Sequence, residues 1–216
     1  MKIKLFEFSS LVVNTYVLSD ETAECVIIDP ACLHPDEKEM LFSYIVSNNL
    51  RVKHLLNTHL HFDHILGNNF VASQFGVKPE AHAADEPLLK DIPNQLKMFG
   101  IYAPNLSAPP IGKYLKENDI VSFGNQELHV FHIPGHSPGS IIFYHKATHS
   151  AFVGDVLFNG SIGRTDFTEG NYDQLIEGIK NKLFILPDET IVYPGHGPAT
   201  TIGNEKKYNP FVGSES

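Results

Sequence analysis

Residues 59–64 of this 216-residue chain read His59-Leu60-His61-Phe62-Asp63-His64. With 12 histidines and 11 aspartates in the chain, an H-x-H-x-D-H pattern is expected by chance only about 0.002 times. The pattern directly follows Val52–Leu56, an apolar run that predicts a strand. It therefore lies on a loop at the end of a strand, a position where a rigid scaffold commonly carries a functional site.

The spacing within this segment favours metal binding. In an extended backbone His59 and His61 project to the same side, and two neutral imidazoles suit a borderline metal such as zinc. Asp63 and His64 add a carboxylate and a further imidazole. A catalytic zinc ion typically keeps three protein ligands and one open position. Four candidate ligands in six residues therefore predict two ions.

Three more candidate ligands occupy tight turns after predicted strands: His136 in Pro-Gly-His-Ser, Asp155 in Gly-Asp and His196 in Pro-Gly-His-Gly. A lone histidine in such a turn is more often structural, and the hexapeptide is what shifts the balance towards a metal site. One ion would take His59, His61 and His136, and the other Asp63, His64 and His196. Either Asp155 or a water would bridge them.

The rest of the chain predicts sheets alternating with helices, with no linker or repeat, which fits a single layered domain over residues 1–216. Strands are predicted at 3–8, 14–18, 25–28, 52–56, 120–123, 127–133, 141–144, 151–153 and 191–193. Helices are predicted at about 35–49, 65–75, 85–98, 172–184 and 200–207, and an irregular loop at 102–112.

Composition narrows the possible partners. Apolar residues are 42% and charged residues 19%, which is typical of a globular protein. A net charge of −9 disfavours nucleic acid and anionic membranes as general partners. No apolar run is long enough to span a bilayer, and the first residues lack the apolar region of a signal peptide, so we expect a cytoplasmic location. Cys25 and Cys32 match no disulfide framework or metal spacing.

These motifs resemble the metallo-β-lactamase-fold superfamily. Two further stretches narrow the resemblance to short glyoxalase II-like hydrolases: Gly154–Phe158 with Ser161–Asp166, and Gly203-Asn204-Glu205 with Asn209-Pro210. The resemblance covers nearly the whole chain. It implies an α+β fold, an αβ/βα four-layer sandwich of two mixed sheets packed face to face with helices outside. It also implies the ligand division above, with Asp155 as the bridge.

The implied reaction is hydrolysis of a thioester of the S-lactoylglutathione type by hydroxide bound to two divalent ions, most simply zinc, with iron or manganese as alternatives. Asp63 would orient that hydroxide. No serine or cysteine nucleophile is required for this reaction. Bound ions would make the pocket locally cationic and able to take an anionic thioester.

Six other residues are candidates around the site. Asp29, at a strand end, would accept a hydrogen bond from a ligand imidazole, unless it is an ordinary turn residue. Arg164 and Asp166 would form an internal pair that holds the loop after Asp155. Candidates for the pocket wall are Phe158, Asn159 and Tyr193.

Several alternatives remain open. An iron-dependent persulfide dioxygenase of the same superfamily would use only His59, His136 and Asp155. Another ester or lactone hydrolase would use the full set, and a non-enzymatic metal-binding module would need no open position. A secreted β-lactamase and an RNA-processing nuclease are disfavoured. Full-length glyoxalase II enzymes have a C-terminal helical region with glutathione contacts, and only 20 residues follow His196 here. We therefore expect a different mode of glutathione recognition or a different thioester or ester.

Overall fold

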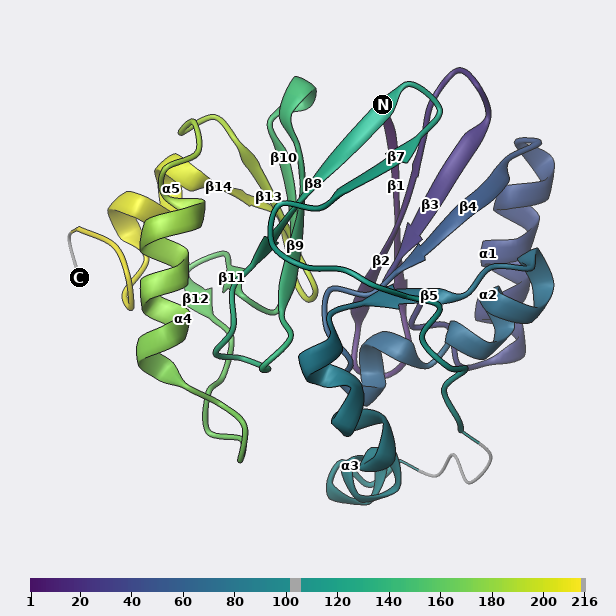
Figure 1. Cartoon of the computed structure of the whole chain (residues 1–216), viewed down its shortest axis with the longest axis horizontal. Coiled ribbons are helices and arrows are strands. Elements are labelled where there is room, and N and C mark those ends of the chain that lie inside the picture. Colours follow the sequence, from purple (N-terminus) through teal and green to yellow (C-terminus); the bar gives the residue numbers. More distant parts are fainter. Residues whose placement is uncertain (102–105, 215–216) are drawn as a thin grey trace.

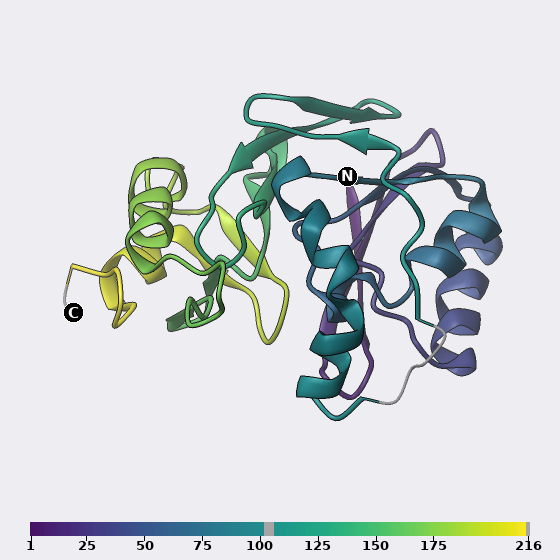
Figure 2. The same ribbon diagram turned by 60° about the horizontal axis from the view of Figure 1, so that its bottom comes forward.

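Two β-sheets pack face to face, and helices cover the outer side of each (Figure 1). The computed structural model describes residues 1–101 and 106–214, so part of the loop predicted at 102–112 lies outside the described residues. Figure 2 shows α1 and α2 on one outer side and α4 on the other. This is the predicted α+β sandwich of four layers with two mixed sheets.

The first sheet has six strands in the order β1-β2-β3-β4-β5-β6. Its first three strands are antiparallel, and β3 to β6 are parallel. The strands are β1 (Lys2–Phe8), β2 (Val13–Ser19), β3 (Glu24–Ile28), β4 (Arg51–Leu56), β5 (Pro79–Ala81) and β6 (Lys113–Tyr114). The helical segments after β3, β4 and β5 are α1 (Pro35–Ser47), η1 (Phe62–Ile65), α2 (Asn68–Phe75), η2 (Ala83–Lys90) and α3 (Ile92–Met98).

The second sheet has six strands in the order β14-β13-β10-β9-β8-β7. All its neighbours are antiparallel except β10 and β13, which a helical crossover connects in parallel. The strands are β7 (Ile120–Phe123), β8 (Gln126–His132), β9 (Ile141–His145), β10 (Ser150–Gly154), β13 (Ile191–Pro194) and β14 (Thr200–Thr201). The remaining elements are η3 (Lys146–Thr148), the hairpin β11 (Leu157–Phe158) and β12 (Ser161–Ile162), α4 (Tyr172–Gly178), η4 (Ile179–Leu183) and α5 (Ile202–Tyr208).

The core consists of layers that follow from this architecture. Leu18 and Ile28 of the first sheet pack with Phe143 and Phe152 of the second in one buried cluster between the sheets. Separate clusters fill the space between each sheet and its own helices. All seven residues of β2 are buried, as expected for a strand covered on both faces.

Three predicted helices differ from the structure in their boundaries, and the one predicted at 200–207 begins only at Ile202, after the short strand β14. The helix predicted at 85–98 is divided into η2 and α3, because Pro87 and Pro93 each lack the N–H that a continuous helix needs. The helix predicted at 65–75 begins only at Asn68, after the separate turn η1. The hydrophobic pattern of the sequence also did not predict four strands of two residues each, which are too short to show an alternation of apolar and polar residues. These strands are β6, β11, β12 and β14.

Backbone hydrogen bonds join the two sheets where the candidate ligand loops meet. Ile141 N–H donates to Thr58 O across the sheets at 2.8 Å, and Asn14 N–H donates to Gly195 O at 2.7 Å. The carboxyl ends of β4, β10 and β13 therefore face the same region, which both sheets share. No helix in the described ranges has the length and apolar character that crossing a membrane requires.

Candidate metal centre

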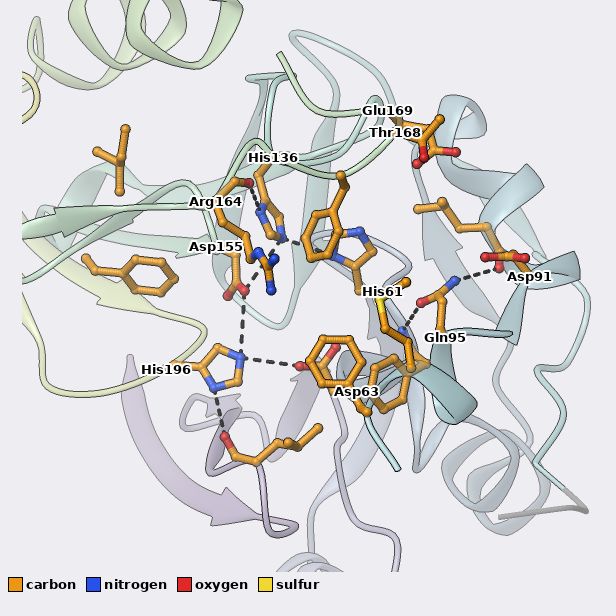
Figure 3. Close-up of a pocket in the computed structure, with 18 of the residues that line it drawn as sticks. His61, Asp63, Asp91, Gln95, His136, Asp155, Arg164, Thr168, Glu169 and His196 are labelled. Carbon is orange, nitrogen blue, oxygen red and sulfur yellow. Dashed lines mark hydrogen bonds and ion pairs between the residues drawn. The ribbon is translucent and has the colours of Figure 1, made fainter. Parts of the chain in front are cut away.

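All seven predicted ligand residues converge at this junction. Figure 3 shows His61, Asp63, His136, Asp155 and His196 turned towards one another from separate segments. Within each of three groups the candidate ligand atoms lie within 4.8 Å of one another, and these groups are His59 with His61 and His136, Asp63 with His64 and His196, and Asp29 with His59 and His64. The first two groups are the two triplets that the sequence predicts for two ions.

Asp155 lies between the two triplets. Its Oδ1 is 3.4 Å from His64 Nε2, and its Oδ2 is 3.6 Å from His136 Nε2 and 3.7 Å from His196 Nε2. Oδ1 therefore faces the triplet that contains His64, and Oδ2 faces histidines of both triplets. This is the placement that a bridging ligand requires.

The residues present fit divalent metal ions. His59 Nε2, His64 Nε2 and Asp155 Oδ1 are buried and have no hydrogen-bond partner among the described residues. Leaving such atoms unpaired is costly, so a native structure that keeps several together calls for an ion or a water. Five imidazoles and two carboxylates form a donor set suited to zinc or iron.

The protonation of the ligands also suits a cation. Burial, assisted by the neighbouring imidazoles, lowers the pKa of His59 well below its usual value and that of His61 to about 3. Burial acts in the same direction on His64, but the carboxylates of Asp155 and Asp63 outweigh it and raise the pKa of that imidazole. The carboxylates thus favour a positive charge at this point, and a bound metal ion would supply it in place of a proton.

Oxygen acceptors fix the orientation of three ligand imidazoles. His136 Nδ1 lies 2.9 Å from Arg164 O, and His196 Nδ1 lies 3.1 Å from Leu11 O. Because a carbonyl oxygen only accepts, each Nδ1 must carry the proton, which leaves Nε2 free for a metal. Asp29 Oδ2 does the same for His64, with Nδ1 at 3.1 Å. This is the position that the sequence suggested for Asp29.

Asp29 itself is held by a second pair of hydrogen bonds. Its carboxylate accepts from Thr58 N–H at 2.8 Å and from Thr58 Oγ1 at 2.5 Å, and its side chain is buried. These bonds connect the end of β3 to the residue directly before the hexapeptide. The carboxylate therefore places the ligand loop as well as the ligand ring.

The sequence reasoning did not identify Asp85, which connects two ligand loops. Its buried carboxylate accepts from Leu60 N–H at 3.0 Å, from Ser137 Oγ at 2.8 Å and from Gly139 N–H at 2.5 Å. Asp85 therefore holds the 59–64 loop against the 134–139 loop. An acidic residue near a helix start is ordinary, so the sequence offered no signal for this role.

Asn14 was also not identified, and it fixes the turn that carries His196. Its Nδ2 donates to Pro194 O at 3.0 Å and to Gly197 O at 2.8 Å. Gly195, in the same turn, lies so close to Asp155 and the His64 ring that a Cβ atom would collide with both. The glycine is therefore required for the close approach of the ligands.

The C-terminal motif supports the β11–β12 hairpin. Glu205 is fully buried and accepts from Gly160 N–H at 3.0 Å, Thr200 Oγ1 at 2.6 Å and Asn209 Nδ2 at 2.8 Å. Asn209 Nδ2 also donates to Ser161 O at 3.0 Å. These contacts hold the hairpin beside the metal-ligand cluster, where its residues Phe158 and Ser161 face a cavity.

The ligand cluster opens into that cavity, whose volume is about 460 Å³. Of the pocket-wall candidates, Phe158 lines the cavity, whereas Asn159 and Tyr193 are not among its lining residues. Arg164 also lines the cavity (Figure 3). Tyr193 instead stacks on Phe152 in the core, with ring centroids 4.9 Å apart. Its position on β13 did not reveal which face it occupies.

Arg164 and Asp166 form the internal pair that the sequence suggested. Two parallel hydrogen bonds of 2.7 and 2.8 Å join the guanidinium and the carboxylate. The backbone of Arg164 at the same time accepts from His136, as described above. The pair therefore stiffens a loop that orients a ligand.

The chain is similar to known proteins in sequence and in fold. The chain is 38% identical to the hydroxyacylglutathione hydrolase GloC of Haemophilus influenzae over 218 residues, covering all of both chains. It superimposes on the BLEG-1 B3 metallo-β-lactamase with a TM-score of 0.88, at 36% identity over 98% of this chain and 99% of that one. TTHA1623 in a di-iron-bound form gives a TM-score of 0.85, at 33% identity over 97% of this chain and 100% of that one. The family model of the metallo-beta-lactamase superfamily matches residues 10–196, a span that includes every candidate ligand. The chain therefore belongs to the metallo-beta-lactamase superfamily.

Proposed function

We propose that the protein is a glyoxalase II-like thioester hydrolase that works with two divalent metal ions, most simply zinc. The observation that carries this proposal is the convergence of two ligand triplets and a bridging carboxylate on the floor of one cavity. The 38% identity to a hydroxyacylglutathione hydrolase supports the same reaction class. We further propose that residues 1–216 act as one domain in the cytoplasm, on small molecules and not on nucleic acid.

The ions would supply an activated water as nucleophile and would polarise the thioester carbonyl. The residues of the chain would hold the ions and orient the attacking water. His59, His61 and His136 would hold one ion, and Asp63, His64 and His196 the other. The Asp155 carboxylate would hold the two at a fixed separation.

Asp63 is placed to do more than bind a metal. Its Oδ2 lies 3.4 Å from His196 Nε2, and its side chain reaches the cavity. A carboxylate in that position would accept a hydrogen bond from the attacking water and orient it towards the carbonyl carbon. We therefore assign Asp63 both ligand and orienting roles.

The alternative of a mononuclear persulfide dioxygenase would leave half of the cluster without a role. A site made only of His59, His136 and Asp155 does not need the second triplet, whose ligand atoms lie within 4.8 Å of one another. Metal content separates the two. Two ions per chain support the hydrolase, whereas about one iron with thiol-dependent oxygen uptake would exclude it.

The direct test is hydrolysis of S-lactoylglutathione and a panel of other thioesters, lactones and β-lactams, with and without a chelator. We expect turnover of thioesters that chelation abolishes. His59→Ala should abolish that turnover while far-UV circular dichroism stays unchanged, and His129→Ala, on β8 outside the cluster, is the matched control. If no thioester reacts faster than with the chelated enzyme, the proposal fails.

A further inference from the structure

We propose that the site selects a thioester whose larger portion is apolar and uncharged, and that it disfavours an anionic portion such as glutathione. This inference rests on the proposed hydrolase function and concerns only which substrate that function serves. It comes from the walls and the mouth of the cavity, not from the metal ligands. Three separate features of the cavity support it.

The first feature is aromatic walls directly beside the metal ligands. The Phe167 ring centroid lies 5.1 Å from that of His61 and 5.9 Å from that of His136. On the opposite side, the Phe158 ring is 6.5 Å from the His196 ring. Both rings line the cavity, so a group attached to a carbonyl at the metal ligands would lie near phenyl rings. Such rings favour apolar and aromatic partners.

The second feature is an apolar mouth. Met98 and Phe99, at the end of α3, line the cavity and yet are 74% and 43% exposed. Phe99 packs on Phe62, with ring centroids 5.2 Å apart, and Leu88 continues the same wall. Exposed apolar side chains that rim a cavity commonly mark a surface covered by a ligand. A bound apolar group would remove this surface from water.

The third feature is the charge of the outer cavity. Arg164 is the only lysine or arginine among the described lining residues, and Asp166 already neutralises it through two hydrogen bonds. Its guanidinium also stacks on Phe167, 4.3 Å from the ring centroid. Asp91 and Glu169 lie on the other side of the pocket from His196 (Figure 3) and are exposed.

Among the lining residues that the structure describes, the outer cavity therefore offers a substrate two exposed carboxylates and no unpaired lysine or arginine. Bound ions would attract an anionic group that touches them, but the carboxylates of glutathione lie several bonds away from the thioester carbonyl. Those groups would meet Asp91 and Glu169 instead. Like charges in a partly dehydrated cleft repel, and the repulsion is screened by salt.

The test compares four thioesters at equal enzyme and metal. S-lactoyl-N-acetylcysteamine is the neutral reference, S-lactoylglutathione carries the charge, and the benzyl thioester of lactate and S-phenylacetyl-N-acetylcysteamine each add one aromatic group. Each kcat/KM is divided by the rate of the uncatalysed alkaline hydrolysis. We expect at least one aromatic substrate to exceed the reference about 10-fold, because burying such a group changes specificity by that order. We expect S-lactoylglutathione to fall below the reference.

Two variants assign the effect to these residues. Phe99→Ala should lower severalfold the ratio of kcat/KM for the aromatic substrate to kcat/KM for the reference. Ile185→Ala is its control, because Ile185 is also apolar, is 74% exposed and is not among the lining residues. The double variant Asp91→Asn, Glu169→Gln should raise the ratio of S-lactoylglutathione to the reference about 2- to 5-fold at low salt, and less at high salt. The double variant Glu177→Gln, Glu189→Gln is the control for net charge, since it also removes two exposed carboxylates and neither residue is among the lining residues.

The outcomes separate the two proposals. If none of the four thioesters reacts faster than with chelated enzyme, the hydrolase proposal itself fails. If thioesters react but S-lactoylglutathione exceeds the reference and both aromatic substrates, the hydrolase stands and the apolar selection is wrong. Ratios that the variants leave unchanged would also overturn it.

Discussion

Replacing Asp29 by asparagine should weaken the binding of one of the two proposed metal ions and leave the binding of the other nearly unchanged. Asparagine keeps the size of the side chain and tolerates the left-handed backbone at this position, where φ is +48°. Its amide oxygen can still accept from Thr58 N–H, which leaves the NH₂ group facing His64 Nδ1. Two donors then face each other. The imidazole must move or shift its proton to Nε2, the atom that would bind the metal.

The magnitude follows from the contact that is lost. Changing an acceptor behind a metal-bound histidine typically costs 10- to 100-fold in metal affinity, and His64 belongs to only one of the two triplets. Competition with a chromophoric chelator should therefore show one ion bound about 10- to 100-fold more weakly and the other nearly unchanged. Hydrolysis should fall in parallel and recover as the metal concentration is raised.

A matched control separates this effect from the loss of any buried carboxylate. Asp20 is also buried at a strand end, and its carboxylate also accepts from a backbone N–H and a threonine hydroxyl, but it has no histidine partner. Asp20→Asn should destabilise the fold without changing either metal affinity. If Asp29→Asn binds both ions as tightly as the parent, or if Asp20→Asn loses metal to the same extent, the reasoning is refuted.

Three further predictions concern other parts of the chain. Burial raises the pKa of both Cys25 and Cys32 to about 12, so neither thiol should react with iodoacetamide at pH 7.5 until denaturant unfolds the chain, and fast labelling of the folded protein would contradict this. Gly163→Ala would place a Cβ atom on Asp155 O, so metal stoichiometry by mass spectrometry should fall below that of the parent. Burial raises the pKa of Asp20, but four hydrogen bonds outweigh it and lower the value to about 2. The resulting stabilisation, of order 2 kcal/mol, is present above pH 4 and lost towards pH 2, so urea denaturation of Asp20→Asn should differ from the parent at pH 6 and converge with it near pH 2.

The candidate ligand residues could be proposed from the sequence because their residue types are chemically distinctive and their turns end strands. His59 and His61 stand two residues apart, and His136 and His196 stand beside glycines, so composition and spacing were enough to propose them. The supporting residues were not predictable by the same means. Asp85 is one of many acidic residues near a helix start, and its role depends on which loops the fold brings against it. That information is in the tertiary packing and not in any local pattern.

The same distinction explains the pocket. Phe158 stands three residues after the candidate ligand Asp155, so its proximity to the site could be inferred from the sequence. Tyr193 is equally near in sequence to a candidate ligand, His196, yet it faces the core, because alternate residues of a strand point to opposite sides. Met98 and Phe99 lie far from every candidate ligand in sequence and reach the cavity from the end of α3, a separate helix with Pro93 in its first turn. Substrate contacts depend on such details of helix placement.

The distribution of ligands between the sheets gives the metal ions a structural consequence as well as a chemical one. His59, His61, Asp63 and His64 follow β4 of the first sheet, whereas His136, Asp155 and His196 follow strands of the second. Each triplet takes ligands from both sheets, so each ion would tie the two halves of the sandwich together at one edge. A ligand that binds only the folded state stabilises it by about 4 kcal/mol at a thousand times its dissociation constant. Between the ligand loops, Asp85 and Asn14 already cross the same junction without a metal. We therefore expect the ions to add to a junction that is formed before they bind, so that removing them costs activity and stability but not the fold.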